Sequence, residues 1–243
     1  MKNFKGKVVV ITGGGRGIGQ EITNEFLKKN YFVYSLDKNF NSNHKSERNE
    51  KIKIDITNFN RIKTILKTIY KKRGSIDVLI NCAGITTKLK KNNLLNYWNS
   101  TINNNLTSAF MISMFALPYL KKSNYPSIIN ITSITAKLGM SNNPAYNASK
   151  AGLKNLTYSL AMDFREHKIR VNNICPGYIK TNMTKKSFNN KNFFKERVKR
   201  MMVKSYGSPR DIAKAAIFLA SESSSYINAS DLVIDGGFLR KGI

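Results

Sequence analysis

The sequence predicts an α/β domain in which a parallel sheet of about seven strands carries helices on both faces. Short apolar, β-branched segments alternate with segments of helical periodicity along the whole chain, which indicates βαβ units. Connections between parallel strands are right-handed, so the sheet should be doubly wound. No linker divides the 243 residues, a length that suits one large α/β domain, residues 1–243.

The first third of the chain shows this alternation clearly. Residues 7–12 are expected to form a buried strand because they are a short β-branched run that stops at glycines. Residues 17–29 follow as a helix whose apolar side chains recur on one face. Residues 31–36 are the second expected strand, which stops at Asp37. Residues 39–50 are polar, have no apolar period and are expected to form a loop.

The middle of the chain continues the pattern. Residues 51–54 are the third expected strand, which ends at Asp55. Residues 76–80 are the fourth, closing at Asn81, and residues 94–120 are expected to be largely helical. The helix between these two strands is marked by apolar residues with helical spacing: Ile62, Ile65, Leu66 and Ile69.

The C-terminal part adds three more strands and two helices. Strands are expected at residues 127–131, 169–174 and 232–234, and helices at residues 144–164 and 209–220; Pro209 suits the first turn of the second helix. Pro176 and Gly177 end the sixth strand. Residues 178–206 are polar and basic, and we expect a mobile segment that contains an amphipathic helix.

Composition argues against several classes of protein. The net charge is +27, from 41 Lys+Arg against 14 Asp+Glu, which suggests a nucleic-acid or other anionic partner. The lysines are scattered over nearly every expected helix, however, and no nucleic-acid-binding motif accompanies them. A solvated basic surface is therefore the preferred interpretation, without a nucleic-acid partner.

Neither a membrane partner nor a metal site is expected. Residues 106–120 form the longest apolar stretch, which is too short and too polar to span a bilayer, and no signal peptide precedes the first strand. Cys82 and Cys175 lie in apolar runs without metal-ligand spacing, so we interpret them as buried thiols of a reducing compartment. A cytoplasmic location is predicted.

A glycine-rich turn joins the first strand to the first helix. It reads Thr12-Gly13-Gly14-Gly15-Arg16-Gly17-Ile18-Gly19. Glycines allow a tight turn and let the backbone approach a pyrophosphate, while the helix N-terminus offers free N–H groups and the positive end of its dipole. The spacing differs from the common G-x-G-x-x-G fingerprint. The order strand, turn, helix nevertheless favours a dinucleotide at this turn, as in the Rossmann fold.

Asp37 bears on the choice of nucleotide. A carboxylate at the end of the second strand can accept hydrogen bonds from the adenosine ribose hydroxyls, and it would repel a 2′-phosphate. This favours NAD over NADP. Arg16 and Lys38 keep NADP open, since either cation could attract that phosphate.

Tyr146 and Lys150 form the candidate reacting pair. In a helix they lie four residues apart on one face. An adjacent ammonium favours the phenolate and should lower the tyrosine pKa from its reference value of about 10. The pair is therefore a candidate general acid/base for an alcohol or a carbonyl.

Together these motifs resemble the short-chain dehydrogenase/reductase family, and the resemblance covers residues 7–237. The family's TGxxxGxG turn appears at residues 12–19, its NNAG element as Asn81-Cys82-Ala83-Gly84, and its YxxxK motif at residues 146–150. Cys82 departs from the usual second asparagine, which leaves the packing at this strand end open. The remaining matches are single residues or pairs: Asp55, Asn105, Ser133, Pro176-Gly177 and Thr181.

The resemblance implies hydride transfer between a nicotinamide and a carbonyl/alcohol pair. It implies that Tyr146 transfers the proton, that Ser133 holds the substrate oxygen, that Lys150 assists Tyr146 and binds the nicotinamide ribose, and that Asn105 holds a water next to Lys150. The tract Asn103-Asn104-Asn105 leaves that register open by one residue. The implied cofactor-binding residues are Gly13, Gly15, Arg16, Gly17, Ile18, Gly19, Asp37, Asp55, Ile56, Asn81, Ala83, Gly84, Tyr146, Lys150, Pro176, Gly177, Ile179 and Thr181.

Three functions stay open from the sequence. The first is a dehydrogenase of a small alcohol, sugar or ketone that uses NAD. The second is an NADPH-dependent 3-oxoacyl-[acyl-carrier-protein] reductase, to which Gly84-Ile85-Thr86 and residues 234–237 are similar. The third is a non-catalytic binding protein of the same fold, which the complete set of Asn105, Ser133, Tyr146 and Lys150 disfavours. The resemblance implies a small carbonyl or alcohol as the substrate, with an anionic or carrier-bound one open, and it implies a homotetramer or homodimer.

Overall fold

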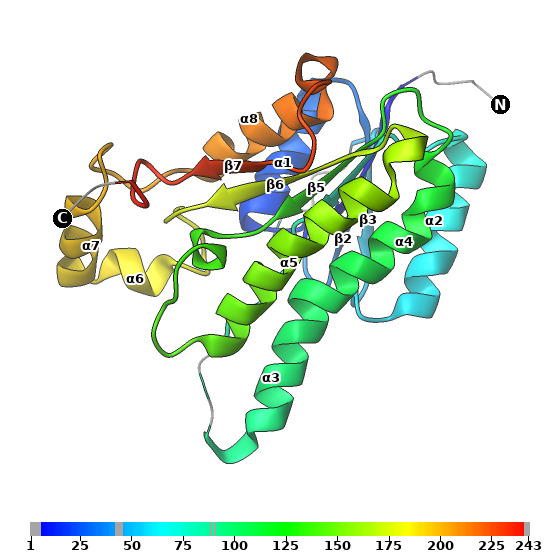
Figure 1. The fold of residues 1–243 in the computed structure, drawn as a ribbon. Coiled ribbons are helices and arrows are strands. Elements are labelled where there is room, and N and C mark those ends of the chain that lie inside the picture. The colour runs from blue at the N-terminus through cyan, green and yellow to red at the C-terminus, as the bar shows by residue number, and fades with distance from the viewer. Residues whose placement is uncertain (1–5, 42–45, 88, 90, 241–243) are drawn as a thin grey trace.

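The computed structural model describes residues 6–41, 46–87, 89 and 91–240. These residues form one α/β domain around a seven-stranded parallel sheet with the order β3-β2-β1-β4-β5-β6-β7 (Figure 1). The strands are β1 (Val8–Thr12), β2 (Phe32–Asp37), β3 (Asn49–Lys53), β4 (Val78–Asn81), β5 (Ser127–Ile131), β6 (Arg170–Pro176) and β7 (Asp231–Ile234). The α-helices are α1 (Gly17–Lys28), α2 (Phe59–Arg73), α3 (Leu94–Ile102), α4 (Ser108–Leu120), α5 (Pro144–Asp163), α6 (Lys185–Asn189), α7 (Lys191–Lys199) and α8 (Pro209–Ala220).

The strand order creates a topological switch point. The chain builds outward from β1 to β3, then returns to place β4 on the other side of β1. Loops that follow β1 and β4 therefore leave the carboxyl edge of the sheet in opposite directions. A crevice at this point is where doubly wound folds bind their ligands.

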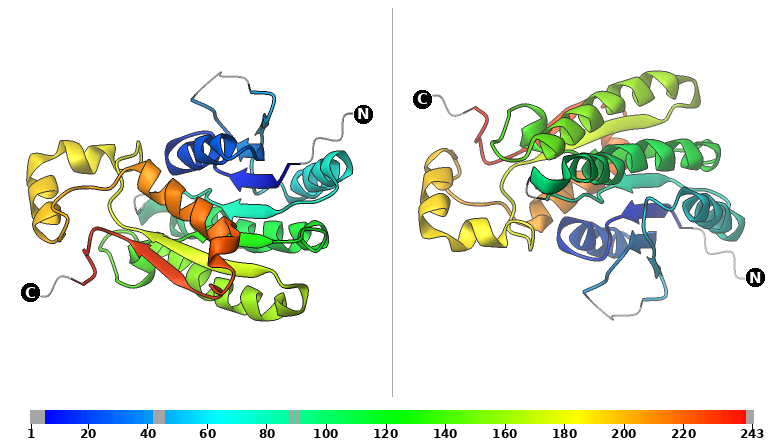
Figure 2. Two further views of the ribbon diagram at one scale, coloured as in Figure 1. Left: turned by 90° about the horizontal axis from the view of Figure 1, so that it is seen from above. Right: turned by 90° about the horizontal axis from the view of Figure 1, so that it is seen from below.

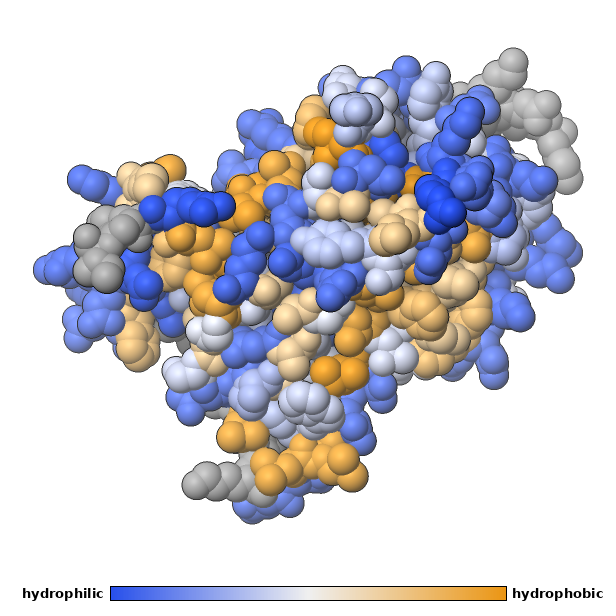
Figure 3. Space-filling view, viewed as in Figure 1, coloured by the Kyte–Doolittle hydropathy of each residue, from blue (hydrophilic) through white to orange (hydrophobic). Residues whose placement is uncertain are grey.

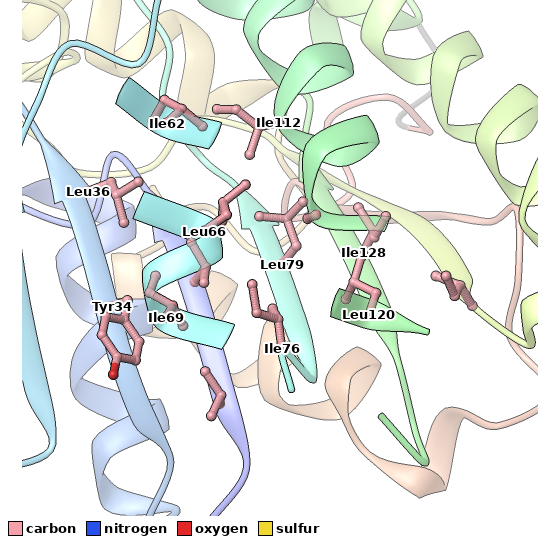
Figure 4. Packing of buried hydrophobic residues seen from close by; sticks show 14 of the residues in the cluster. Tyr34, Leu36, Ile62, Leu66, Ile69, Ile76, Leu79, Ile112, Leu120 and Ile128 are labelled. Carbon is pink, nitrogen blue, oxygen red and sulfur yellow. The ribbon is translucent and has the colours of Figure 1, made fainter. Parts of the chain in front are cut away.

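Alternating side chains of β1 enter two separate cores. Val8 and Val10 join the cluster that packs under α2, α4 and α5, whereas Val9 and Ile11 join the cluster that packs under α1 and α8. Figure 2 shows α1 and α8 from above and α4 and α5 from below, on opposite faces of the sheet. Figure 4 shows the first core, in which residues of β2, β4 and β5 face the apolar sides of α2 and α4.

A third apolar cluster lies beside the carboxyl edge. Ile134, Met201, Tyr206 and Phe238 are buried there, and side chains of α6 and α7 pack against them. Figures 1 and 2 place α6 and α7 next to the ends of β6 and β7, away from the rest of the domain. The basic segment that follows β6 is thus held at the edge where the strands end.

The predicted fold class is confirmed, and every predicted strand and helix has a counterpart. The loop predicted for residues 39–50 is wrong at its end, because β3 begins at Asn49, while residues 42–45 lie outside the described part of the chain. Asn49 and Glu50 pair with Val33 and Tyr34 of β2. β3 is an edge strand that is half exposed to water, so it can carry polar side chains. These polar residues led to the wrong prediction of a loop. Residues 178–206 contain two helices rather than one.

The predicted helix at residues 94–120 is one continuous helical run with a defect. Asn103–Thr107 form a π-helical turn between α3 and α4. Such turns carry one extra residue and occur frequently at functional sites. Within the described residues, no helix is both long enough and apolar enough to cross a membrane.

Candidate active site at the carboxyl edge of the sheet

The glycine turn after β1 is packed too closely for other residues at four positions, including Gly14, where a Cβ would lie 2.9 Å from Ser35 Cβ. A Cβ on Gly15 would lie 2.0 Å from the Asn39 carbonyl oxygen, one on Gly19 would lie 2.1 Å from the Gly13 carbonyl oxygen, and one on Gly13 would lie 2.8 Å from the Ala83 backbone. Gly13 also has a φ of +70°, which disfavours side chains. The turn therefore locks β1, β4 and the loop after β2 together.

Gly17 differs from these glycines because it faces open space. It has a φ of +56°, and a Cβ would meet nothing closer than Thr181 at 3.7 Å. No side chain caps the first turn of α1, and that turn carries no acidic residue. Arg16 is exposed there, and Ile18 packs against the second core. An open, uncapped helix N-terminus beside a glycine fits the pyrophosphate of a dinucleotide.

Asp37, at the end of β2, lies against this turn. Its carboxylate is buried and accepts hydrogen bonds from the backbone N–H groups of Gly15 (3.0 Å) and Asn39 (3.2 Å). Lys38 does not approach Asp37; its ammonium pairs with Asp55 at 2.8 Å. The carboxylate at the end of β2 is therefore held in place by the turn itself.

Asp55 and Ile56 follow β3. Burial raises the pKa of Asp55, but hydrogen bonds from Lys38 and Thr57 outweigh that effect, so the net pKa is lowered. The Asp55 side chain is partly exposed, whereas Ile56 is buried in the first core. Of these two residues, only Asp55 has a side chain exposed enough to contact a nucleotide.

The candidate reacting residues meet at the ends of β4 and β5. Lys150 is only 4% exposed, and its ammonium donates a hydrogen bond to the Ile131 carbonyl at 2.8 Å. Its Nζ lies 5.8 Å from the centre of the Tyr146 ring. Ser133 is buried just beyond β5, and its Oγ accepts a hydrogen bond from the Thr135 N–H at 3.2 Å. Ser133 also forms a hydrogen bond with Tyr146.

Gly84 leaves room for this group. A Cβ at Gly84 would lie 3.4 Å from both Lys150 Nζ and Asn105 Oδ1. Asn105 is buried in the π-helical turn, whereas Asn103 is exposed, so the register predicted from the sequence agrees with the packing. The Asn105 amide is bonded on both sides: it donates to the Ile85 carbonyl and Ser149 Oγ and accepts from the Ile85 N–H.

Burial dominates the protonation of the pair. It lowers the pKa of Lys150 to about 8, and neighbouring thiols act weakly in the opposite direction. Burial also raises the pKa of Tyr146, against the hydrogen bond from Ser133. The expectation of a lowered Tyr146 pKa is therefore wrong for the protein without bound ligands, because desolvation of the phenolate outweighs the hydrogen bond from Ser133.

Cys82 occupies the position of the missing asparagine without disturbing the strand end. Its N–H and that of Ala83 both donate to Thr12 Oγ1, at 3.1 and 3.2 Å. Burial raises the pKa of the Cys82 thiol to about 12. Asn81, next to it, donates from Nδ2 to Ser113 Oγ and Asn130 Oδ1. Thr12 therefore closes β4 onto β1 and holds Ala83 and Gly84 in place.

The turn after β6 reaches back to the glycine turn. Gly177 donates to the Ile234 carbonyl at 2.8 Å, and a Cβ there would lie 2.7 Å from Asp235. Ile179 is buried in the second core. Thr181 lies opposite Gly17, and its N–H donates to Thr184 Oγ1 at 3.0 Å. Thr181 thus brings the turn after β6 to the start of α1.

Three supporting side chains were not singled out from the sequence. Ser149 receives a hydrogen bond from Asn105, Thr12 fixes the end of β4, and Asn130 binds Asn81. Their signal was present, since Ser149 lies inside the YxxxK motif, Thr12 ends β1 and Asn130 is the last residue but one of β5. Among the described residues, no group of three or more His, Cys, Asp or Glu side chains is placed to hold a metal ion.

Comparison with known proteins agrees with this arrangement. Residues 13–239 match the family model described as enoyl-(acyl carrier protein) reductase. The chain is 36% identical to a 3-oxoacyl-[acyl-carrier-protein] reductase of Chlamydia pneumoniae and 33% identical to one of Thermotoga maritima; the matches cover 96% and 97% of this chain and 96% and 99% of those proteins.

Two solved structures are similar over nearly the whole chain. The aldohexose dehydrogenase of Thermoplasma acidophilum superposes with a TM-score of 0.88 at 33% identity and covers 98% of this chain and 96% of its own. A 4-hydroxyisoleucine dehydrogenase in complex with NADH superposes with a TM-score of 0.90 at 31% identity, over 98% of this chain and 100% of its own. The chain therefore belongs to the short-chain dehydrogenase/reductase family of nicotinamide-dependent oxidoreductases, which act on hydroxyl and carbonyl groups.

Proposed function

We propose that the protein is an NAD-dependent oxidoreductase of a small carbonyl or secondary alcohol, with Tyr146 as general acid/base. The observation that carries the proposal is the grouping of Tyr146, Lys150 and Ser133 beyond the ends of β4 and β5, where Lys150 also lies next to Gly84. Asn105 closes the group from the π-helical turn. These four side chains are the catalytic set, and the residues around the glycine turn hold the cofactor.

Each side chain has a distinct task in the reduction of a carbonyl. When bound, the nicotinamide supplies the hydride. Burial keeps the Tyr146 phenol protonated near neutral pH, so that it can donate a proton to the carbonyl oxygen. The Ser133 hydroxyl donates to the same oxygen and orients it. The Lys150 ammonium stabilises the phenolate that remains, and Asn105 holds the Gly84–Ile85 backbone beside it.

The glycine turn supports NAD rather than NADP. Hydrogen bonds from the Gly15 and Asn39 N–H groups fix the buried Asp37 carboxylate. In this position it can accept hydrogen bonds from the adenosine ribose hydroxyls and repel a 2′-phosphate. Lys38 is paired with Asp55 and does not neutralise Asp37. Arg16 is exposed at the turn and could attract that phosphate, so NADP stays the alternative cofactor.

A 3-oxoacyl-[acyl-carrier-protein] reductase is the second candidate, because several relatives over 30% identical carry that name. The same four catalytic residues serve either reaction. Exposed lysines of the segment after β6, including Lys185, Lys191 and Lys195, would suit an anionic or carrier-bound substrate. The chain-wide excess of lysine is the competing explanation of that charge.

We also propose a cytoplasmic homotetramer or homodimer. Both cysteines are free thiols, which suits a reducing compartment. Leu94, Leu95 and Trp98 expose apolar surface on α3, and Phe110 and Met114 do so on α4; Figure 3 shows apolar surface at the end of α3, low in the view.

Light scattering at micromolar concentration should give a multiple of 27.5 kDa. A mass of 27.5 kDa there would exclude the oligomer.

Removing the phenol hydroxyl tests the acid/base directly. Tyr146→Phe should lower kcat by at least about a hundredfold, the usual contribution of general acid catalysis, and leave NADH affinity nearly unchanged. Tyr226→Phe is the matched control, because Tyr226 is fully exposed. Steady-state rates and NADH fluorescence titration measure the two effects. Wild-type turnover in Tyr146→Phe would refute the assignment.

Lys150 should lower the free energy of unfolding and yet be necessary for activity. Its folded-state pKa of about 8 lies below its ordinary 10.5, so the buried charge destabilises the ligand-free protein below pH 8 by roughly 3 kcal/mol. Lys150→Met should therefore raise the unfolding free energy at pH 7 by about 1–3 kcal/mol, because loss of the hydrogen bond to Ile131 offsets part of the gain. Activity should fall by orders of magnitude.

The sign of the pH dependence makes this test specific. Between pH 8 and 10.5 the unfolded state binds more protons at this site, so wild-type stability should rise with pH and the advantage of Lys150→Met should shrink. Urea unfolding across this window measures it, with the exposed Lys121→Met as control. An advantage that stays constant with pH, or a less stable variant at pH 7, contradicts the buried-charge account.

The nucleotide preference follows from Asp37. Wild type should bind NADH at least about tenfold more tightly than NADPH, and Asp37→Asn should narrow that ratio by removing the repulsion. Asparagine can still accept the Gly15 hydrogen bond. The exposed Asp163→Asn should leave the ratio unchanged. Tighter binding of NADPH by wild type would overturn the NAD assignment and favour the acyl-carrier-protein reductase.

A further inference from the structure

Asp231, the first residue of β7, is tied to three elements that carry or border the active site. Its Oδ2 lies 2.8 Å from Lys137 Nζ and 3.6 Å from Lys154 Nζ, and its Oδ1 accepts a hydrogen bond from Asn173 Nδ2 at 2.9 Å. Tyr158 also forms a hydrogen bond with it. The Asp231 side chain is only 10% exposed. One buried carboxylate thus joins β7 to β6, to α5 and to the turn that contains Ser133.

A chain of hydrogen bonds fixes Asp231 to the centre of the sheet. Asn81 donates to Asn130 (2.8 Å), Asn130 to Thr157 (2.7 Å), Thr157 to Asn173 (2.6 Å) and Asn173 to Asp231 (2.9 Å). Every donor points the same way, toward the carboxylate. Aligned hydrogen bonds polarise one another in a buried setting, and a negative charge at the acceptor end suits that polarity. Asp231 is therefore a rigid anchor rather than a surface partner.

Lys137 links this anchor to Ser133. Ser133 begins the short helical turn Ile134–Ala136, and Lys137 ends it. The Ala136 N–H donates to the Ser133 carbonyl, and the Lys137 N–H donates to the Ile134 carbonyl, so the two ends move as one unit. Ser133 Oγ takes its orientation from the Thr135 N–H inside the same turn. The ion pair between Lys137 and Asp231 is thus a tether between the turn and the sheet.

We propose that Asp231 is a positioning residue that acts through Lys137 to hold the Ser133 hydroxyl in its reactive place. The inference rests on the proposed function, since it assigns Ser133 to the substrate oxygen. A displacement of about 1 Å is enough to lose most of the rate that positioning provides. Loss of the tether should therefore lower turnover without touching the glycine turn or the nucleotide.

The first test is hydrogen exchange of the turn, which needs no substrate. Asp231→Asn keeps an acceptor for Asn173 but removes the ion pair with Lys137, and Lys137→Met removes it from the other side. Both variants should exchange the amides of residues 134–138 at least about fivefold faster, with α8 unchanged. Glu222→Gln, which breaks the exposed 3.5 Å pair with Lys7, is the control. Unchanged exchange, or faster exchange throughout the domain, overturns the proposal.

The second test is a double-mutant cycle with NADH and ethyl acetoacetate as the carbonyl probe. Asp231→Asn and Lys137→Met should each lower kcat about tenfold and change NADH affinity less than twofold. Combined with Ser133→Ala, Asp231→Asn should cost less than a further twofold, because the group that it positions is gone. A full tenfold loss in both backgrounds refutes the positioning role. A fully active Ser133→Ala refutes the role assigned to Ser133 and with it the positioning role of Asp231. The proposed function itself fails only if the wild type does not oxidise NADH with a carbonyl, and the exchange result tests the tether in either case.

Discussion

The burial of one ammonium group constrains the whole carboxyl edge of this protein. Lys150 enters the space between β4 and β5 almost completely shielded from water, with the Ile131 carbonyl as its hydrogen-bond acceptor. A buried charge is expensive unless its surroundings compensate it. Gly84 has no side chain that could displace it, and Asn105 fixes the backbone at its flank. The domain tolerates this cost at the place where the proposed reaction needs a cation.

Parallel strands bring the other parts of the site to that cation. Because all seven strands run the same way, the turns after β1, β4, β5 and β6 leave the sheet at one edge. Thr12 binds the end of β4, and Thr181 lies opposite Gly17, so turns that are far apart in sequence meet at this edge. The cofactor turn and the reacting residues are thereby coupled through short backbone contacts, which explains why several glycines are irreplaceable there.

The sequence was sufficient to predict the fold class and to single out most residues of the candidate site, since both depend on local patterns. β-branched runs, helical periodicity and glycine spacing are visible without the structure, and Asn105, Ser133, Tyr146 and Lys150 follow from their motifs. The start of β3 was missed because pairing with β2 outweighs the polar side chains of Asn49 and Glu50. The pKa of Tyr146 was predicted in the wrong direction because spacing reveals the nearby ammonium but not the desolvation. The ion pair between Asp231 and Lys137 joins residues that are distant in sequence, so no single segment of the sequence could predict it.

A crystal structure with NAD⁺ tests the central claim, that the buried Lys150 and the half-buried Tyr146 face the reacting end of the cofactor. The account predicts the pyrophosphate at the open N-terminus of α1 beside Gly17. It also predicts Lys150 Nζ within hydrogen-bond distance, about 3 Å, of a hydroxyl of the nicotinamide ribose. A nucleotide bound elsewhere, or a nicotinamide ribose beyond the reach of both Lys150 and Tyr146, would contradict the account.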